Sequence, residues 1–271
     1  MPAWLYDLIG QASGVTFSQV GLLAFVTALI AGYVRGFVGF GSSLIIVMVL
    51  SVVVGPPAAV GIAGLSGVAI VVQLLPNAVR YAERPFVVPF GLSTFLAAPI
   101  GTWVLVIADP AAMRILISLF VLMMVAMLYR DWRPRRADAP GFLLSAGFVA
   151  GAVQGASGVG GPPAVAIALA REGTAQTQRA NVIGATSALT LCGLPALWYN
   201  GVLTREVVVI SLVSIPFYMV GTWLGAVFFN QYGNRHFRNA ALLSLAIVGV
   251  LTLLLATRDY VYHNGAAVVS P

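Results

Sequence analysis

The sequence predicts an all-α polytopic membrane protein built from two repeats. Three observations lead to this fold class. The chain of 271 residues is 60% hydrophobic and only 8% charged, which is too few charges to cover a soluble surface. A glycine-rich motif at residues 31–41 recurs 119 positions later at residues 150–160, with four glycines at matching positions. The tripeptide Gly-Thr-Trp at residues 101–103 recurs 120 positions later at residues 221–223.

These repeats divide a single membrane domain, residues 1–271, into a first repeat at residues 20–136 and a second at residues 137–257. Each repeat is predicted to hold one re-entrant helical hairpin broken by glycines and three transmembrane helices. Residues 1–18 form a weakly amphipathic lead-in. No Lys or Arg precedes Arg35, so the basic start of a cleavable signal peptide is missing and we expect the first apolar segment to be retained.

The first hairpin is predicted at residues 20–54, which are uncharged except for Arg35. As one helix these 35 residues would rise about 52 Å, more than the hydrocarbon thickness of about 30 Å, yet two full crossings need about 40 residues. Glycines at fixed spacing inside apolar sequence indicate an unusual backbone conformation or a close approach of another group. We therefore place the tip of the hairpin at residues 35–41.

The remaining spans follow in the same order in both repeats. After Pro56 and Pro57, which end the hairpin, the first repeat is expected to hold helices at residues 58–76, 86–108 and 111–129. The second repeat is expected to hold an interrupted segment at residues 141–170, a polar loop at residues 171–179, and spans at residues 180–198, 207–229 and 239–256.

The loop at residues 130–136 is the most basic on the chain and is predicted to face the cytoplasm. Three crossings per repeat would invert the second repeat relative to the first. An inverted arrangement places ten of the fourteen arginines, Arg171 and Arg179 among them, on the cytoplasmic side, whereas a parallel arrangement places eight there. The positive-inside rule favours inversion, with both termini outside, and the parallel arrangement stays open.

An anion site is predicted where the two hairpin tips meet near the bilayer midplane. Helix breaks at matching positions of two repeats are typical of transporter binding sites, and the N–H groups at helix starts bind anions. Arg35 is the only charged residue between Asp7 and Arg80, and a lone charge at membrane depth needs a partner or a task. Its planar guanidinium suits a carboxylate, sulfite or sulfonate group.

The other candidate contacts lie mainly in the two motifs. In the first motif they are Gly36, Gly39, Gly41, Ser42 and Ser43, and in the second they are Gln154, Gly155, Ser157, Gly158, Gly160 and Gly161. Gln154 is the neutral counterpart of Arg35, so the site would have one positive side. Each serine could equally bond to its own helix backbone. Gln73 and Asn181, on the spans that follow the hairpins, are secondary candidates for a pathway.

An enzyme is the competing class of function. The run Gly-Ala-Ser-Gly at residues 155–158 matches the pattern of intramembrane serine proteases, which would need a histidine base near Ser157. However, His236 falls in a predicted loop and His263 in the C-terminal tail. The single cysteine, Cys192, and the lack of paired carboxylates give no metal site, and no basic cluster is interleaved with aromatic residues. We therefore expect a protein that is not an enzyme and that binds no cofactor, metal or nucleic acid.

The two motifs, Gly-Phe-Val-Gly-Phe-Gly at residues 36–41 and Gly-Ala-Ser-Gly-Val-Gly-Gly at residues 155–161, resemble those of the TauE/SafE family, also called the sulfite exporter or TSUP family. The resemblance covers residues 20–257. It implies a permease of the bacterial-type plasma membrane, with about eight spans from a duplicated unit. It also implies sulfite, sulfoacetate or a related organic anion as substrate. The first copy departs from the family pattern at Ser42 and Ser43, where glycine often follows.

The expected function is export of such an anion by a secondary transporter, with the anion bound between the tips and access alternating between the two sides. An anion-selective channel is the alternative. The expected partners are the small anion and the lipid bilayer, and a homo-oligomer is compatible with the sequence. The expected location is a bacterial-type inner membrane, which the chain crosses several times.

Overall fold

The computed structural model describes residues 19–107, 130, 139–158, 160–171, 173–232 and 243. Within these residues it holds eight helices and no strand, which confirms the all-α fold class. Five of these helices are long and apolar enough to cross a bilayer, as expected for a multi-pass membrane protein. The predicted spans at residues 111–129 and 239–256 and the loop at residues 130–136 lie, apart from two single residues, outside the described part.

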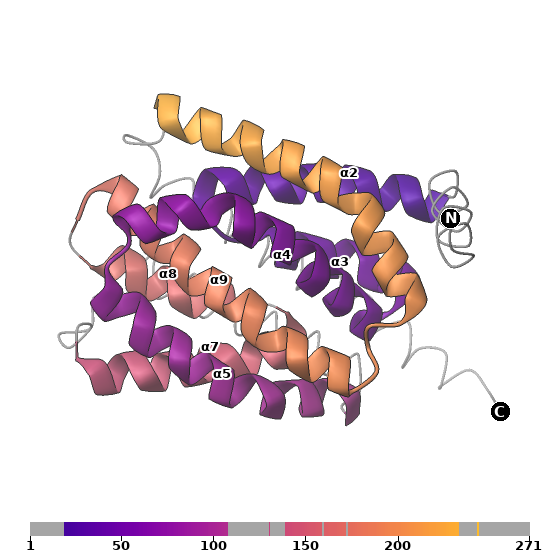
Figure 1. The fold of residues 1–271 in the computed structure, drawn as a ribbon, viewed down its shortest axis with the longest axis horizontal. Coiled ribbons are helices and arrows are strands. Elements are labelled where there is room, and N and C mark those ends of the chain that lie inside the picture. Colours follow the sequence, from indigo (N-terminus) through magenta and orange to yellow (C-terminus); the bar gives the residue numbers. More distant parts are fainter. Residues whose placement is uncertain are drawn as a thin grey trace, which may run out of the picture.

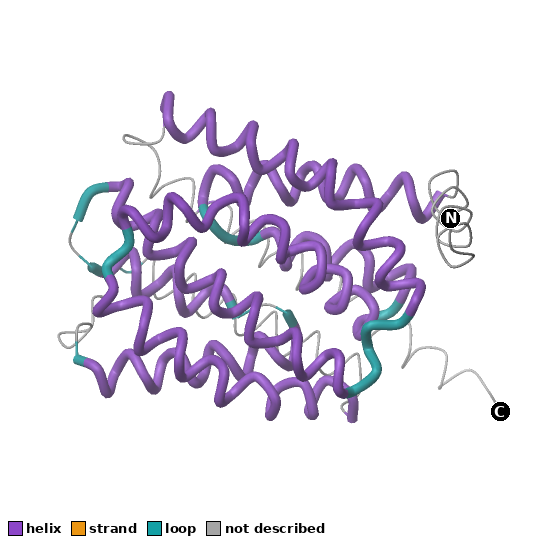
Figure 2. Tube along the Cα trace, in the orientation of Figure 1, coloured by secondary structure: helices purple, strands orange, loops and turns teal. Residues whose placement is uncertain are grey.

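The described helices are long and run back and forth along one axis of the molecule (Figure 1). In chain order they are α2 (Gln19–Val38), α3 (Ser42–Val54), α4 (Pro56–Tyr81), α5 (Arg84–Ile107), α7 (Pro140–Ser157), α8 (Gly161–Ala170), α9 (Ala175–Tyr199) and an unlabelled helix, Arg205–Tyr232. Figure 2 shows that most connections lie at the two ends of the molecule, while short loops interrupt helices in its interior.

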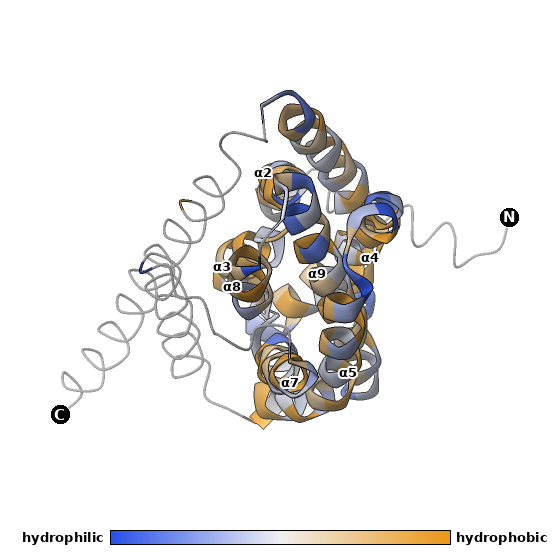
Figure 3. Cartoon of the chain, turned by 90° about the vertical axis from the view of Figure 1, so that its left-hand side faces the viewer, coloured by the Kyte–Doolittle hydropathy of each residue, from blue (hydrophilic) through white to orange (hydrophobic). Residues whose placement is uncertain are grey.

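The helices lie in three layers, which Figures 1 and 3 show from two directions. One outer layer pairs α2 with the Arg205–Tyr232 helix, the opposite outer layer pairs α5 with α7, and α3, α4, α8 and α9 lie between. Each outer layer thus combines one helix from each half of the chain. Large hydrophobic side chains such as Leu96 and Trp198 are exposed on the outside, which suits a surface that faces lipid.

The helices are interrupted at both glycine motifs. α2 ends at Val38 and α7 at Ser157, and α3 begins at Ser42 and α8 at Gly161, so both pairs of boundaries are 119 residues apart. Glycines with positive φ make the breaks: Gly39 at 93° and Gly41 at 92° in the first, and Gly158 at 71° in the second. An L-residue with a side chain is strained in this region, which explains why glycine recurs at the equivalent positions 39 and 158.

The arms of the two interrupted segments differ in length. The 20 residues of α2 rise about 30 Å, enough to span the hydrocarbon core alone, whereas the 13 residues of α3 rise about 20 Å. The 18 residues of α7 and the 10 of α8 follow the same order of a long arm and a short one. The prediction of re-entrant hairpins therefore stays a prediction, because either long arm reaches across a bilayer by itself.

Two helix starts differ from the prediction. Pro56 and Pro57 begin α4 rather than end the preceding unit, since proline fits the first helical turn, where an N–H has no intrahelical partner. α9 begins at Ala175, capped by the Thr174 hydroxyl, which accepts a hydrogen bond of 3.2 Å from Thr177 N. The predicted loop at residues 171–179 is thus too long. Arg179 lies inside α9 and is buried, so it does not count among the cytoplasmic loop charges.

Glycines fasten each interrupted segment to a helix from the other half of the chain. A Cβ at Gly36 of α2 would collide with the backbone of Thr222, and one at Gly155 of α7 would collide with the backbone of Ala98 and Thr102. These helices approach each other closely because no side chain stands between their backbones, which is the small-residue packing typical of membrane helices.

The repeated Gly-Thr-Trp tripeptide belongs to these same contacts. A Cβ at Gly101 would collide with the carbonyl of Ala152, and one at Gly221 with the carbonyl of Leu29. Both threonines of the tripeptide are fully buried. Trp103 and Trp223 are 60% and 59% exposed and point out of the bundle. The tripeptide therefore repeats because each copy packs its helix against a helix from the other half of the chain.

α4 and α9 pack against each other at the centre of the molecule in opposite directions. Gly64 lies beside Leu194 and Leu197, and Gly67, further along α4, lies beside Thr190, which comes earlier in α9. These two helices occupy corresponding places in the chain, because Pro56 and Ala175, where they begin, are 119 residues apart.

Candidate functional site

A small cavity lies between the two helix breaks, with walls from α2, α3, α7, α8 and α9. Its volume is about 20 Å³, which is room for one water molecule. The residues that line it are Arg35, Phe40, Gly41, Ser43, Leu44, Gln154, Gly158, Gly161, Thr186, Leu189 and Thr190. Six of the residues predicted from the sequence thus meet at one place: Arg35, Gly41, Ser43, Gln154, Gly158 and Gly161.

Arg35 contributes the charge of this cavity. It lies in the last turn of α2, is only 4% exposed, and its Nε has no hydrogen-bond partner in the described structure. A buried donor without a partner is costly, and the cost is higher for a charged group. The first break therefore presents a buried guanidinium whose Nε lacks an acceptor.

The start of α3 adds further donors on the same side. Its N-cap residue is Gly41, with a φ of 92° and no side chain to cap the helix. The first N–H groups of an α-helix have no partner inside the helix, and the positive end of the helix dipole lies there. Ser43, in this first turn, lines the cavity. Arg35 and the start of α3 thus bring donors together at one wall of the cavity, an arrangement whose chemistry suits an anion.

The second break offers fewer donors. Gln154 Oε1 accepts a hydrogen bond of 2.8 Å from Gly160 N, so this side chain bridges the break between α7 and α8. The Ser157 hydroxyl donates to the carbonyl of Val153 at 2.6 Å. α8 opens with Pro162 and Pro163, which carry no N–H. The cavity is therefore asymmetric, with its donors gathered around the first break.

Arg179 is a residue of this region that the sequence reasoning missed. It is 2% exposed, its Nε donates to the carbonyl of Phe37 at 3.1 Å, and its other donor binds the carbonyl of Gly36. Its guanidinium also lies 4.3 Å from the ring centroid of Phe229. A cation at the C-terminus of a helix satisfies carbonyls that the helix leaves free. Arg179 thus caps the end of α2 that carries Arg35.

A second side chain of α9 reaches the same break. The Thr186 hydroxyl lies 3.0 Å from the carbonyl oxygen of Gly39 and also lines the cavity. Arg179 and Thr186 are seven residues apart, two turns along one face of the helix. That spacing is the signal in the sequence that could have assigned Arg179 to the interior of α9 rather than to a loop.

The other predicted site residues do not line the cavity. Gly36 and Gly155 pack against neighbouring helices, and Gly39, Ser42, Ser157 and Gly160 lie at the breaks but outside the cavity wall. Gln73 donates a hydrogen bond of 3.2 Å to the carbonyl of Met219 and ties α4 to the Arg205–Tyr232 helix.

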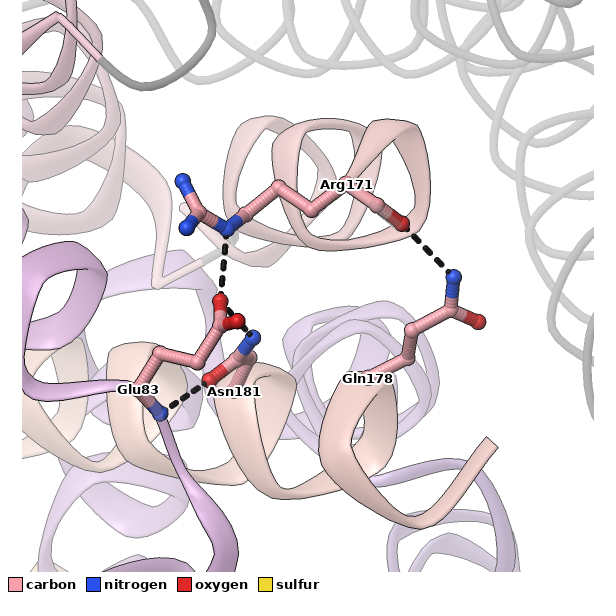
Figure 4. Close-up of polar contacts among 4 residues, drawn as sticks. All are labelled: Glu83, Arg171, Gln178 and Asn181. Carbon is pink, nitrogen blue, oxygen red and sulfur yellow. Dashed lines mark hydrogen bonds and ion pairs between the residues drawn. The ribbon is translucent and has the colours of Figure 1, made fainter. Parts of the chain in front are cut away.

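Asn181 belongs to a polar cluster at one end of the bundle (Figure 4). Its Nδ2 donates to Glu83 Oε2 at 3.0 Å, and its Oδ1 accepts from Glu83 N at 2.7 Å. Arg171 Nε forms an ion pair with the same carboxylate at 2.7 Å, and Gln178 Nε2 donates to the carbonyl of Arg171 at 2.9 Å. The amide of Asn181 therefore serves this cluster, so we leave Asn181 out of the anion site.

The enzyme hypothesis concerns Ser157 and the side chains that could bind a metal ion. In the described residues, no group of three or more His, Cys, Asp or Glu side chains could hold a metal ion. Ser157 is buried and bonds to its own helix, and both histidines lie outside the described part of the chain.

Comparison with known proteins gives one family match. A family model described as sulfite exporter TauE/SafE matches residues 24–252. This stretch holds both glycine motifs and both Gly-Thr-Trp tripeptides. No curated protein and no solved structure matches the chain significantly.

Proposed function

The chain belongs to the sulfite exporter TauE/SafE family, and from this premise we propose that it is a secondary transporter that exports a small organosulfur or organic anion. Membership of the family and five candidate spans support a membrane anion exporter rather than an enzyme. The proposed substrates are sulfite, sulfoacetate or a similar sulfonate, and the proposed location is the inner membrane of a bacterial-type cell.

The observation that carries the proposal is the buried Arg35 at the cavity between the two breaks. Its buried Nε has no hydrogen-bond acceptor, and the uncapped start of α3 adds N–H groups beside it. The negative head of the anion would lie against Arg35 and the first turn of α3, close to Ser43. In a sulfonate, the uncharged part of the anion would face the second break, where prolines replace donors.

Transport would proceed by alternating access between two inverted repeats. The antiparallel packing of α4 and α9, which correspond between the halves, supports inversion over a parallel arrangement. The reciprocal glycine contacts, α2 with the Arg205–Tyr232 helix and α7 with α5, support the duplication. Re-entry of both interrupted segments is part of the same proposal.

The size of the cavity favours a transporter over an open channel. A volume of about 20 Å³ admits a water molecule but is too small for a sulfonate. The two breaks must therefore separate before the anion can enter, and a movement of that kind accompanies each transport cycle. Turnover would then be limited by the movement rather than by diffusion.

The test is anion binding to purified protein, measured by calorimetry or thermal shift with sulfite, sulfoacetate, sulfate and chloride. We expect saturable binding of one sulfur anion to wild type and its loss in Arg35→Gln. Arg80→Gln removes the same charge from an exposed position and should bind as wild type does. If the anion still binds to Arg35→Gln, the site lies away from the cavity. If none of the four anions binds to wild type, the proposed substrate class is wrong.

A further inference from the structure

The cluster around Glu83 joins two segments that are far apart in the sequence. Glu83 lies between α4 and α5, whereas Arg171 and Asn181 flank the connection from α8 to α9. In the proposed division into repeats, Glu83 therefore belongs to the first repeat and both of its partners belong to the second. The ion pair and the two hydrogen bonds hold the repeats together at this end of the bundle (Figure 4).

The cluster connects directly to the anion site through α8. This short helix begins at Gly161, which lines the central cavity, and Arg171 is its C-cap residue. A movement of the second break would carry Arg171 with it, because ten helical residues transmit displacement as a rigid unit. The ion pair with Glu83 opposes such a movement.

The positions equivalent to Glu83 and Arg171, at the other end of the molecule, hold uncharged residues. Positions 119 to 121 residues after Glu83 are Val202, Leu203 and Thr204, and the position 119 residues before Arg171 is Val52. None of these side chains is charged. The two ends are far apart, because α4, whose 26 residues rise about 39 Å, separates Glu83 from the residues that begin this helix.

A large cavity occupies that other end. Its volume is about 370 Å³. It is lined by Val54, Pro57, Ala58, Asn200, Gly201, Val202, Thr204 and Val207, which come from the connection between α3 and α4 and from the connection after α9. These are the connections that correspond to the ones tied together at the Glu83 end. Equivalent regions of the two halves are therefore tied together by polar contacts at one end of the bundle and line a cavity at the other.

We propose that Glu83, Arg171 and Asn181 form a latch that holds one end of the transport path closed, and that the cavity at Ala58 is the same region in its open form. In the opposite state the latch is broken, a cavity opens at the Glu83 end, and the cavity at Ala58 closes. The proposal rests on the proposed function, since inverted repeats exchange their conformations when access alternates. Side-chain exposures of 33% for Glu83 and 13% for Arg171 place the ion pair where water can reach it, so water can solvate both charges when the pair separates.

The test follows the exposure of one cysteine at each end in a background without Cys192. Ala58→Cys reports on the open cavity, and Ala180→Cys, a buried position next to Asn181, reports on the latch end. Protein in nanodiscs is labelled with a water-soluble maleimide. Adding Glu83→Gln should raise the labelling rate at position 180 several-fold and lower the rate at position 58.

Two further variants separate the latch from simpler effects. Glu206→Gln makes the same chemical change at an exposed position and should leave both rates unchanged. The double variant Glu83→Arg with Arg171→Glu restores an ion pair of opposite polarity and should return both rates toward wild type. Unchanged rates in Glu83→Gln, or rates that rise at both ends as local unfolding would cause, overturn the latch.

This readout needs no substrate, so it distinguishes the two proposals. If the labelling rates at positions 58 and 180 change in opposite directions and the anion still binds to Arg35→Gln, the latch is supported and the anion site is refuted. If Arg35→Gln no longer binds the anion and the labelling rates do not change in opposite directions, the anion site is supported and the latch is refuted.

Discussion

Arg35 and Gln154 occupy the same position of the two repeats and yet have different surroundings. Gln154 accepts a hydrogen bond from Gly160 N within its own break, whereas Arg35 Nε is buried without a partner. The amide of Gln154 completes a local structure, while the guanidinium of Arg35 keeps a buried donor available to an acceptor. This difference between two equivalent residues is why we assign the anion to the first break.

Arg179 supports that assignment by holding the end of α2 in place. We expect Arg179→Gln to lower the free energy of unfolding by roughly 3 kcal/mol, because two charge-assisted hydrogen bonds to buried carbonyls are lost or weakened. Arg179→Lys should recover only part of this, since a single ammonium group cannot reproduce the fork of the guanidinium.

Thermal unfolding in detergent measures this effect. Arg84→Gln, at the exposed start of α5, is the matched control and should change stability by no more than about 0.5 kcal/mol. If Arg179→Gln unfolds at the same temperature as the control, then Arg179 does not cap α2.

At the scale of helices, the close contacts between halves depend on glycine. We expect Gly36→Ala and Gly155→Ala each to destabilise the protein by about 1–3 kcal/mol, because the added methyl group collides with the backbone of a neighbouring helix. Gly193→Ala is the control inside α9, where a Cβ would meet no atom within 4 Å. It should be neutral or stabilising by up to about 1 kcal/mol.

Unfolding by detergent titration reports these differences. Equal stability of Gly36→Ala and Gly193→Ala would contradict the packing seen between α2 and the Arg205–Tyr232 helix. A loss in Gly36→Ala without one in Gly155→Ala would mean that the two halves do not use equivalent contacts.

The sequence predicted the helix breaks well because their cause is local. A glycine with positive φ is needed where the chain leaves a helix, and this need is visible in the motif itself. Helix starts were less predictable: Pro56 reads equally as a terminator or as a first helical residue. The spacing of Arg179 and Thr186 could place Arg179 in a helix, but its partners could not be predicted, because the carbonyls of α2 that it binds lie more than 140 residues away in the chain.

The candidate site shows the same limit. Arg35, Gly41, Gln154 and Gly158 belong to the repeated motif, Ser43 and Gly161 follow it within two residues, and all six line one cavity. Thr186, Leu189 and Thr190 complete the wall from α9, and no pattern near the motifs indicates them. Repetition reveals the residues that both halves share, whereas the rest of the wall depends on how the halves pack.

For the whole molecule, the decisive question is what drives the anion outward. The described membrane spans contain one carboxylate, Glu206, in the first turn of a helix, and no Asp or His, so they offer no proton relay at the depth of Arg35. An inside-negative potential of 100 mV favours the exit of each negative charge by about 2.3 kcal/mol, which suffices for export without a coupled ion.

We therefore load proteoliposomes with the anion found to bind and set the membrane potential with a potassium gradient and valinomycin. The efflux rate is expected to rise as the potential becomes more inside-negative. A pH gradient at clamped voltage should not change the rate. Efflux that follows the pH gradient instead would require a proton-binding group, and Glu83 and Glu206 would then be the first side chains to replace.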